Sequence, residues 1–226
     1  MQQVFSTAKE YLNKKRLLLP LAFAALFLVL VHVIWGKATP RRIMYLNLAF
    51  YLFIIVYYFR AFQEQELLKG VKNVRSFLAI AFLSLCGLHL AYVARVFLIR
   101  FSFETWHENG MIDQYVTESY LSFLLYSVIM LILMPVGEEL FFRYALVSFS
   151  SKKATALTVI FSLLLYVAMN ADHPSGFLTL TVPAIVLTVA YLLTKNIYLT
   201  IIVHVIYSIV LNGEFIGYAF VRMLYR

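Results

Sequence analysis

The sequence predicts an all-α fold, a polytopic membrane bundle of seven or eight transmembrane helices, and composition is the main reason. Residues of the types A, V, I, L, M, F, W, Y and C make up 63% of the 226 residues, and charged residues only 13%. Soluble domains are about 45–50% apolar and about 25% charged, so this composition excludes soluble globular and disordered proteins. The alternation with period two that marks a membrane barrel is also absent.

Apolar runs near 20 residues long provide the individual helices, since about 20 residues cross a hydrocarbon core of about 30 Å. The expected spans are residues 17–35, 43–59, 76–99, 119–147, 154–170, 177–194 and 197–212. A short apolar tail at 214–225 is the possible eighth span.

The net charge of +8 predicts topology in the lipid bilayer rather than binding to nucleic acid. Basic residues gather before the first span, between the second and third, and near Lys152, Lys153 and Lys195. By the positive-inside rule these segments and the N-terminus face the cytoplasm. The acidic loop at 101–118 then lies on the opposite side.

We expect a single integral-membrane domain over residues 1–226, with two parts. Residues 1–118 form accessory spans with few ionisable groups, whereas 119–212 carry polar residues within apolar runs and form the expected catalytic core. No internal repeat is visible, which disfavours a small proton-coupled transporter.

The main anomaly is the pair Glu138 and Glu139 inside the apolar run 131–146. A carboxylate at membrane depth costs on the order of 2.5 to 3.5 kcal/mol and by default marks a functional site. Arg143 is four residues after Glu139 and shares its helical face, whereas Glu138 points about 100° away, free to act as a base. Pro135 and Gly137 are expected to weaken the helix there. The alternative is an ordinary solvated helix end at the membrane boundary.

Two further polar clusters follow in later spans. Tyr166, Asn170 and His173 are spaced by four and three residues and can share one helical face, although a helix-terminating loop explains them equally well. His204 lies about seven residues into the last long span, where Ser208 at i+4 is expected to orient its ring, with Asn212 a further turn away.

Together these residues resemble the CPBP family of intramembrane proteases (CAAX protease or bacteriocin-processing, Abi/Rce1-like). Glu138, Glu139 and Arg143 match its EExxxR motif, and the second and third polar helices follow in its order over about residues 119–212. Two positions depart from the family pattern. Asn170 stands where the second motif FxxxH has histidine, with His173 one turn further, and Ser208 stands at the last position of HxxxN or HxxxD.

The resemblance implies that Glu138 is the general base for water, that Glu139 and Arg143 fix the geometry, and that His204 acts with Asn170 or His173. Tyr166, Ser208 and Asn212 would support them. It leaves the cofactor open, either none or a divalent metal such as zinc, in which case Glu138, His173 and His204 are the candidate ligands.

Two functions remain open. One is an intramembrane endopeptidase that cleaves a peptide or membrane protein near the cytoplasmic face, which we expect in a bacterial plasma membrane. The other is a catalytically degenerate relative that acts as a membrane scaffold or a bacteriocin-immunity or regulatory protein. The sequence identifies neither the substrate nor the oligomeric state.

Overall fold

The computed structural model describes residues 17–35, 40–60, 62, 74–101, 119–170 and 174–225, and every regular element within these ranges is a helix. The expectation of an all-helical protein is therefore confirmed for the described residues. The basic N-terminus and most of the acidic loop, which carry part of the topology prediction, lie outside them.

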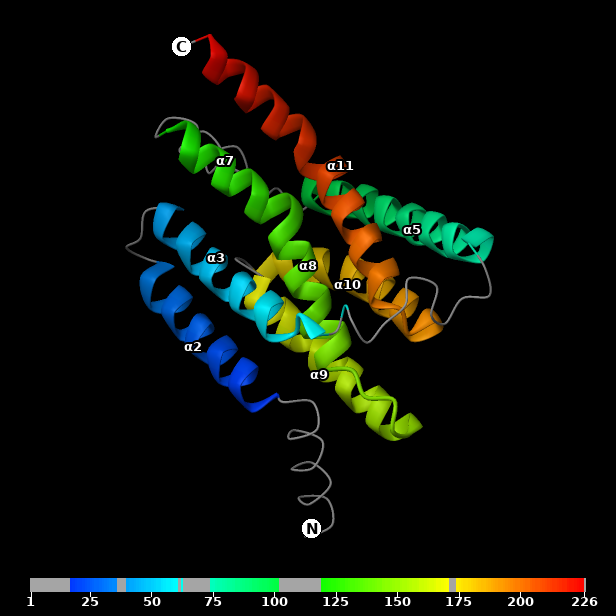
Figure 1. Cartoon of the computed structure of the whole chain (residues 1–226). Coiled ribbons are helices and arrows are strands. Elements are labelled where there is room, and N and C mark those ends of the chain that lie inside the picture. The colour runs from blue at the N-terminus through cyan, green and yellow to red at the C-terminus, as the bar shows by residue number, and fades with distance from the viewer. Residues whose placement is uncertain are drawn as a thin grey trace.

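Within the described residues of the N-terminal part there are three long helices: α2 (Leu18–Trp35), α3 (Pro40–Tyr57) and α5 (Val74–Phe101). Helices α2 and α3 pack side by side, and α5 lies on the far side of the bundle against α10 and α11 (Figure 1). The sequence predicted a span close to each of these helices.

The central rod runs from Tyr120 to Ala145 and changes its helical winding three times. It consists of α7 (Tyr120–Val128), the π-helix η1 (Ile129–Leu133), α8 (Met134–Glu138) and the π-helix η2 (Glu139–Ala145). In Figure 1 α8 lies in the middle of the bundle, where it packs against α3 and α11. The candidate glutamates are thus at the junction of α8 and η2.

Three helices complete the bundle: α9 (Lys152–Asn170), α10 (Pro174–Thr194) and α11 (Ile197–Leu224). The side chain of Asn196 caps α11 by accepting a hydrogen bond from the amide of Leu199 at 3.2 Å. Helix α11 then continues without a break through the apolar tail at 214–225, so this tail forms no separate helix.

A single main core joins the two parts of the chain. Phe50, Tyr51 and Ile54 of α3 are buried together with Phe141 and Phe142 of η2, in one cluster that also takes in α2, α9, α10 and α11. The first two spans are therefore packed directly on the segment that carries the glutamates.

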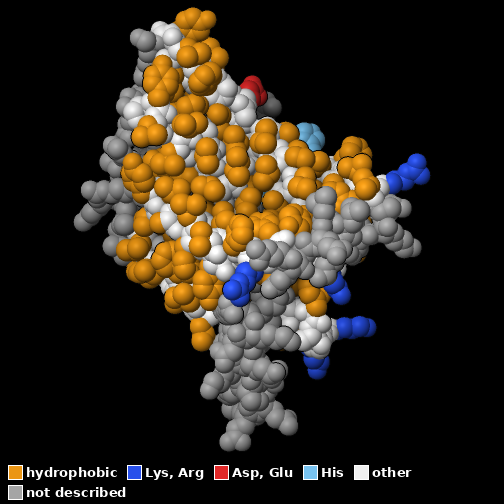
Figure 2. Space-filling view, in the orientation of Figure 1, with side chains coloured by type: hydrophobic (Ala, Val, Ile, Leu, Met, Phe, Trp, Pro, Cys, Tyr) orange, Lys and Arg blue, Asp and Glu red, His pale blue; other side chains and the backbone are white. Residues whose placement is uncertain are grey.

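The outer surface is apolar, as expected for a protein embedded in lipid. Leu121, Val56, Leu193 and Leu90 are each at least 70% exposed. Figure 2 shows apolar side chains over most of the described surface on one face, with Lys and Arg side chains at its margins. Among the described residues, the helical segments long and apolar enough to cross a membrane are the four at Val74–Ala94, Tyr120–Ala145, Lys152–Asn170 and Ile197–Leu224. Three apolar helices in the same part of the chain are shorter, at Leu18–Val31, Met44–Tyr57 and Leu180–Thr194.

Changes of winding leave backbone carbonyls without their usual helical donors, and side chains from other helices bind two of them. At the end of η2 the amide of Leu146 bonds to the carbonyl of Phe141 and that of Val147 to Arg143, so the carbonyl of Phe142 is passed over. The hydroxyl of Ser162 in α9 donates to it at 2.6 Å. This bond ties α9 to η2, because an unpaired buried carbonyl would be costly.

We expect Ser162→Ala to lower the free energy of unfolding by about 1–3 kcal/mol, since it leaves the Phe142 carbonyl buried without a donor. The measurement is detergent-induced unfolding of the purified protein followed by circular dichroism. Ser84→Ala is the matched control, because Ser84 is also buried but donates to the carbonyl of Ile80 in its own helix. An equal loss in both variants would contradict this role of Ser162.

Candidate active site

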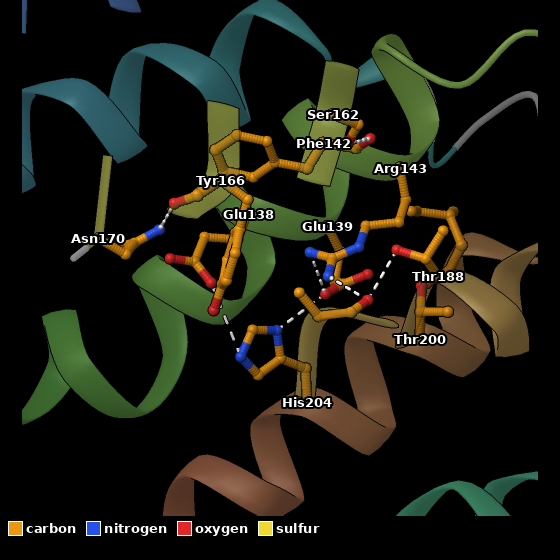
Figure 3. A network of polar contacts seen from close by, with 12 residues as sticks. Glu138, Glu139, Phe142, Arg143, Ser162, Tyr166, Asn170, Thr188, Thr200 and His204 are labelled. Atoms are coloured by element: carbon orange, nitrogen blue, oxygen red, sulfur yellow. Dashed lines mark hydrogen bonds and ion pairs between the residues drawn. The ribbon is translucent and has the colours of Figure 1, made fainter. Parts of the chain in front are cut away.

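Glu138 and Glu139 are fully inside the bundle, where their side chains are 1% and 0% exposed. This burial excludes the alternative of a solvated helix end. Figure 3 shows the polar network that contains them, with residues from the central rod, α9, α10 and α11: Glu138, Glu139, Arg143, Tyr166, Asn170, Thr188, Thr200 and His204.

Arg143 neutralises Glu139. Its Nη1 lies 3.1 Å from Oε1 of Glu139 in the expected i,i+4 pair, and the guanidinium is 1% exposed. Its Nη2 donates to the carbonyl of Ala184 in α10 at 3.2 Å, and its Cζ lies 5.2 Å from the ring centroid of Tyr166 in α9. One arginine thereby joins η2 to two neighbouring helices and supplies the positive charge that a buried carboxylate requires.

His204 lies between the two glutamates. Its Nδ1 is 2.8 Å from Oε1 of Glu139, and its Nε2 is 3.7 Å from Oε2 of Glu138. An ionised carboxylate only accepts hydrogen bonds, so Nδ1 is assigned the proton and Nε2 faces Glu138. Although the sequence predicts that Glu138 points about 100° away from Glu139, both carboxylates reach the ring of His204. Glu139 begins a π-helix, whose wider turn rotates successive residues by less than an α-helix does.

Tyr51 is a member of this site that the sequence analysis missed. Its hydroxyl donates to Oε1 of Glu138 at 3.1 Å, across 87 positions of the chain. Gly137 permits the contact, because a Cβ at that position would lie only 2.6 Å from Cδ1 of Tyr51. Gly137 therefore has a packing role that the sequence analysis did not predict, and the expected weakening of the helix stays a prediction. With 16 tyrosines in an aromatic-rich chain, no sequence signal distinguishes Tyr51.

The second predicted cluster is only partly turned to the glutamates. Tyr166 is buried, with its ring edge-to-face on Phe142 at 5.1 Å between centroids and below Arg143. Asn170 uses its side-chain amide to donate to the carbonyl of Tyr166 at 3.0 Å, within its own helix. His173 lies outside the described residues. The stretch therefore supplies an aromatic wall for Arg143, while Asn170 is bound to backbone.

Ser208 does not orient His204 as the spacing predicted. Its hydroxyl donates to the carbonyl of Met130 at 2.8 Å, and Asn212 donates in turn to Ser208. In η1 the amide of Met134 bonds five residues back, to the carbonyl of Ile129. The same pattern would pair the amide of residue 135 with the carbonyl of Met130, but residue 135 is proline and has no N–H. Ser208 supplies the donor that Pro135 lacks, and Glu139 holds the ring of His204 instead.

The metal site stays a prediction from the sequence. No group of three or more His, Cys, Asp or Glu residues in the described part of the chain is arranged to hold a metal ion. The candidate ligand set of Glu138, His173 and His204 includes one residue outside that part.

The arrangement is suited to proton transfer in a buried site. One carboxylate, Glu139, is neutralised by Arg143 and bound to His204, while the other, Glu138, has no cation within 3.5 Å among the described residues. A carboxylate and an imidazole that face one another can share a water between a base and a hydrogen-bonding group. Such a pair is typical of hydrolytic sites.

Comparison with known proteins agrees with this chemistry. Residues 120–210 match the family model described as type II CAAX prenyl endopeptidase Rce1-like. This segment is therefore similar to an Rce1-like domain, which is consistent with the resemblance to the CPBP family. Together with the apolar helices, this domain indicates an integral membrane protein. No curated protein and no solved structure matches the chain.

We expect Arg143→Gln to lower the free energy of unfolding by about 3–5 kcal/mol, because it leaves Glu139 charged and buried without its cation. The double variant Glu139→Gln with Arg143→Gln should recover part of this loss, since it removes both charges. Thermal unfolding of the purified protein measures both. A double variant as unstable as Arg143→Gln alone would show that the pair is not the source of the effect.

Proposed function

We propose that the protein is an intramembrane endopeptidase that uses a glutamate-activated water. The observation that carries this proposal is the buried Glu138 carboxylate, which faces Nε2 of His204 while Arg143 and Glu139 balance the remaining charge. The substrate is a peptide or a membrane protein. The four long and three shorter apolar helices of the described residues are all proposed to cross a bacterial plasma membrane, with the N-terminus in the cytoplasm.

In the proposed reaction Glu138 takes a proton from a water molecule, whose oxygen attacks the carbonyl carbon of the scissile peptide bond. The carbon–nitrogen bond then breaks, and Glu138 returns the proton to the leaving nitrogen. His204 accepts a hydrogen bond from the water through Nε2 and so orients it, and Glu139 holds the ring by accepting the Nδ1 proton. Arg143 fixes Glu139 so that this orientation is present before substrate binds.

Cleavage near the cytoplasmic face is supported by the positions of the exposed lysines. Lys152 and Lys153 follow η2, and Lys195 immediately precedes α11. Glu139 and His204 each lie six or seven residues from the nearby helix ends at Ala145 and Ile197. At 1.5 Å per residue these separations correspond to about 10 Å along the helices, which supports a site near the basic side.

We expect Glu138→Gln to reduce hydrolysis by at least about 100-fold, since an amide cannot accept the proton of water. The full chain, reconstituted in liposomes, is incubated with a farnesylated peptide that ends in a CAAX sequence, the substrate class in the family's description. Mass spectrometry of the released tripeptide gives the rate. Glu214→Gln, a change at an exposed glutamate of α11, is the control and should retain the wild-type rate.

Retention of activity by Glu138→Gln would overturn the mechanism. Cleavage of the unprenylated peptide at the same rate would remove the prenyl group from the substrate requirement. If neither peptide is cut, the new protein N-termini are compared between membranes that express the wild type and membranes that express Glu138→Gln. Identical sets of N-termini would overturn the endopeptidase function.

A second candidate is the degenerate scaffold or immunity protein, and one observation favours it. Asn170 and Ser208, which occupy two positions of the family motifs, both donate to backbone carbonyls rather than to the glutamates. A scaffold would bind a peptide or membrane protein beside His204 without cutting it.

Affinity capture from membranes distinguishes the two candidates. For the endopeptidase we expect Glu138→Gln to retain an intact partner that the wild type yields only in cleaved form. Capture of the same full-length partner by both proteins would favour the scaffold.

A further inference from the structure

Tyr51 belongs to α3, outside the segment that matches the Rce1-like family, yet it touches the carboxylate at the centre of the site. Among the described residues its hydroxyl is the one donor within hydrogen-bond distance of Glu138. Tyr51 is 2% exposed and Glu138 1% exposed, so bulk water does not compete for the bond. A hydrogen bond to a charged acceptor in such surroundings is stronger than one between neutral groups.

The ring of Tyr51 is held firmly. It packs edge-to-face on Phe50 with centroids 5.3 Å apart, and Phe50 in turn packs on Phe141 of η2. On its other side the ring lies against the backbone of α8 at Gly137, where any side chain would collide with it. The hydroxyl is therefore fixed relative to the helix that carries Glu138.

The two oxygens of Glu138 have different surroundings. Oε1 accepts the bond from Tyr51, and Oε2 faces Nε2 of His204 at 3.7 Å. The terminal torsion of a glutamate is broad, so a carboxylate without such an anchor rotates readily. Asn170, at the position of the histidine in the family's second motif, donates to the carbonyl of Tyr166 and supplies no anchor.

We propose that Tyr51 is a positioning residue, which holds Oε1 of Glu138 so that Oε2 is presented to the water beside His204. This inference rests on the proposed endopeptidase function. The phenol takes no part in bond making or breaking; it restricts the rotation of the base.

The test uses Tyr51→Phe in the full chain, reconstituted in liposomes with the substrate peptide that the wild type cleaves. Loss of a hydrogen bond to a charged group corresponds to a decrease in kcat of about 10- to 100-fold. KM should be unchanged, because the Tyr51 side chain is buried and is expected to make no contact with substrate. Tyr58→Phe is the matched control, since Tyr58 is also a buried tyrosine just after α3 and packs on Tyr57 and Tyr144. This control should retain the wild-type kcat.

Two further measurements separate positioning from a loss of folding. Gly137→Ala should reproduce the fall in kcat, because it displaces the Tyr51 ring while the phenol remains, and combining it with Tyr51→Phe should add little. The infrared carboxyl band of Glu138 is identified as the band that is lost in Glu138→Gln. This band should shift in frequency in Tyr51→Phe.

The outcomes are distinct. Wild-type kcat in Tyr51→Phe, or an unshifted carboxyl band, overturns the role of Tyr51 while the endopeptidase stands if Glu138→Gln is inactive. A Glu138→Gln variant that still cleaves overturns both. Equal decreases in kcat in Tyr51→Phe and Tyr58→Phe would show that Tyr51 acts only as a packing residue, which would overturn its positioning role.

Discussion

The buried ion pair of Arg143 and Glu139 is the constraint on which the rest of the site depends. Two adjacent carboxylates in an apolar bundle require compensation, and one guanidinium supplies it while also bonding to the carbonyl of Ala184 in α10. With Glu139 neutralised and fixed, His204 has a rigid acceptor for Nδ1. The orientation of the imidazole, and hence what faces Glu138, follows from this pair.

The irregular winding of the central rod serves the same end. Two π-helical segments flank the turn that carries Pro135 and Gly137, and they bring Glu138 and Glu139 to the same histidine. In lipid the carbonyls released by such winding need protein donors. Ser208 and Ser162 provide them from α11 and α9. The polar residues around the glutamates therefore form two groups: those that donate hydrogen bonds to backbone carbonyls, and those that bind the charged side chains.

The sequence predicted the helical class and the position of nearly every helix, because hydropathy and length dominate in membranes. It also predicted the Glu139–Arg143 pair, which depends on local spacing alone. It failed where distant segments decide the contact. The i,i+4 spacing suggested that Ser208 would orient His204, whereas a carbonyl 78 residues away binds Ser208. Tyr51 could not be found, since its partner is remote and tyrosine is ordinary in so aromatic a chain.

The packing of α3 on α8 has a consequence for modularity. Residues 120–210 hold the recognisable motifs, but a helix that begins 80 positions earlier supplies the aromatic ring packed on Gly137 and the hydrogen bond to one oxygen of Glu138. A fragment confined to the matched segment would leave a buried carboxylate facing lipid and an aromatic-sized hollow beside it. The packed structure around the site therefore extends beyond the segment that carries the recognisable motifs.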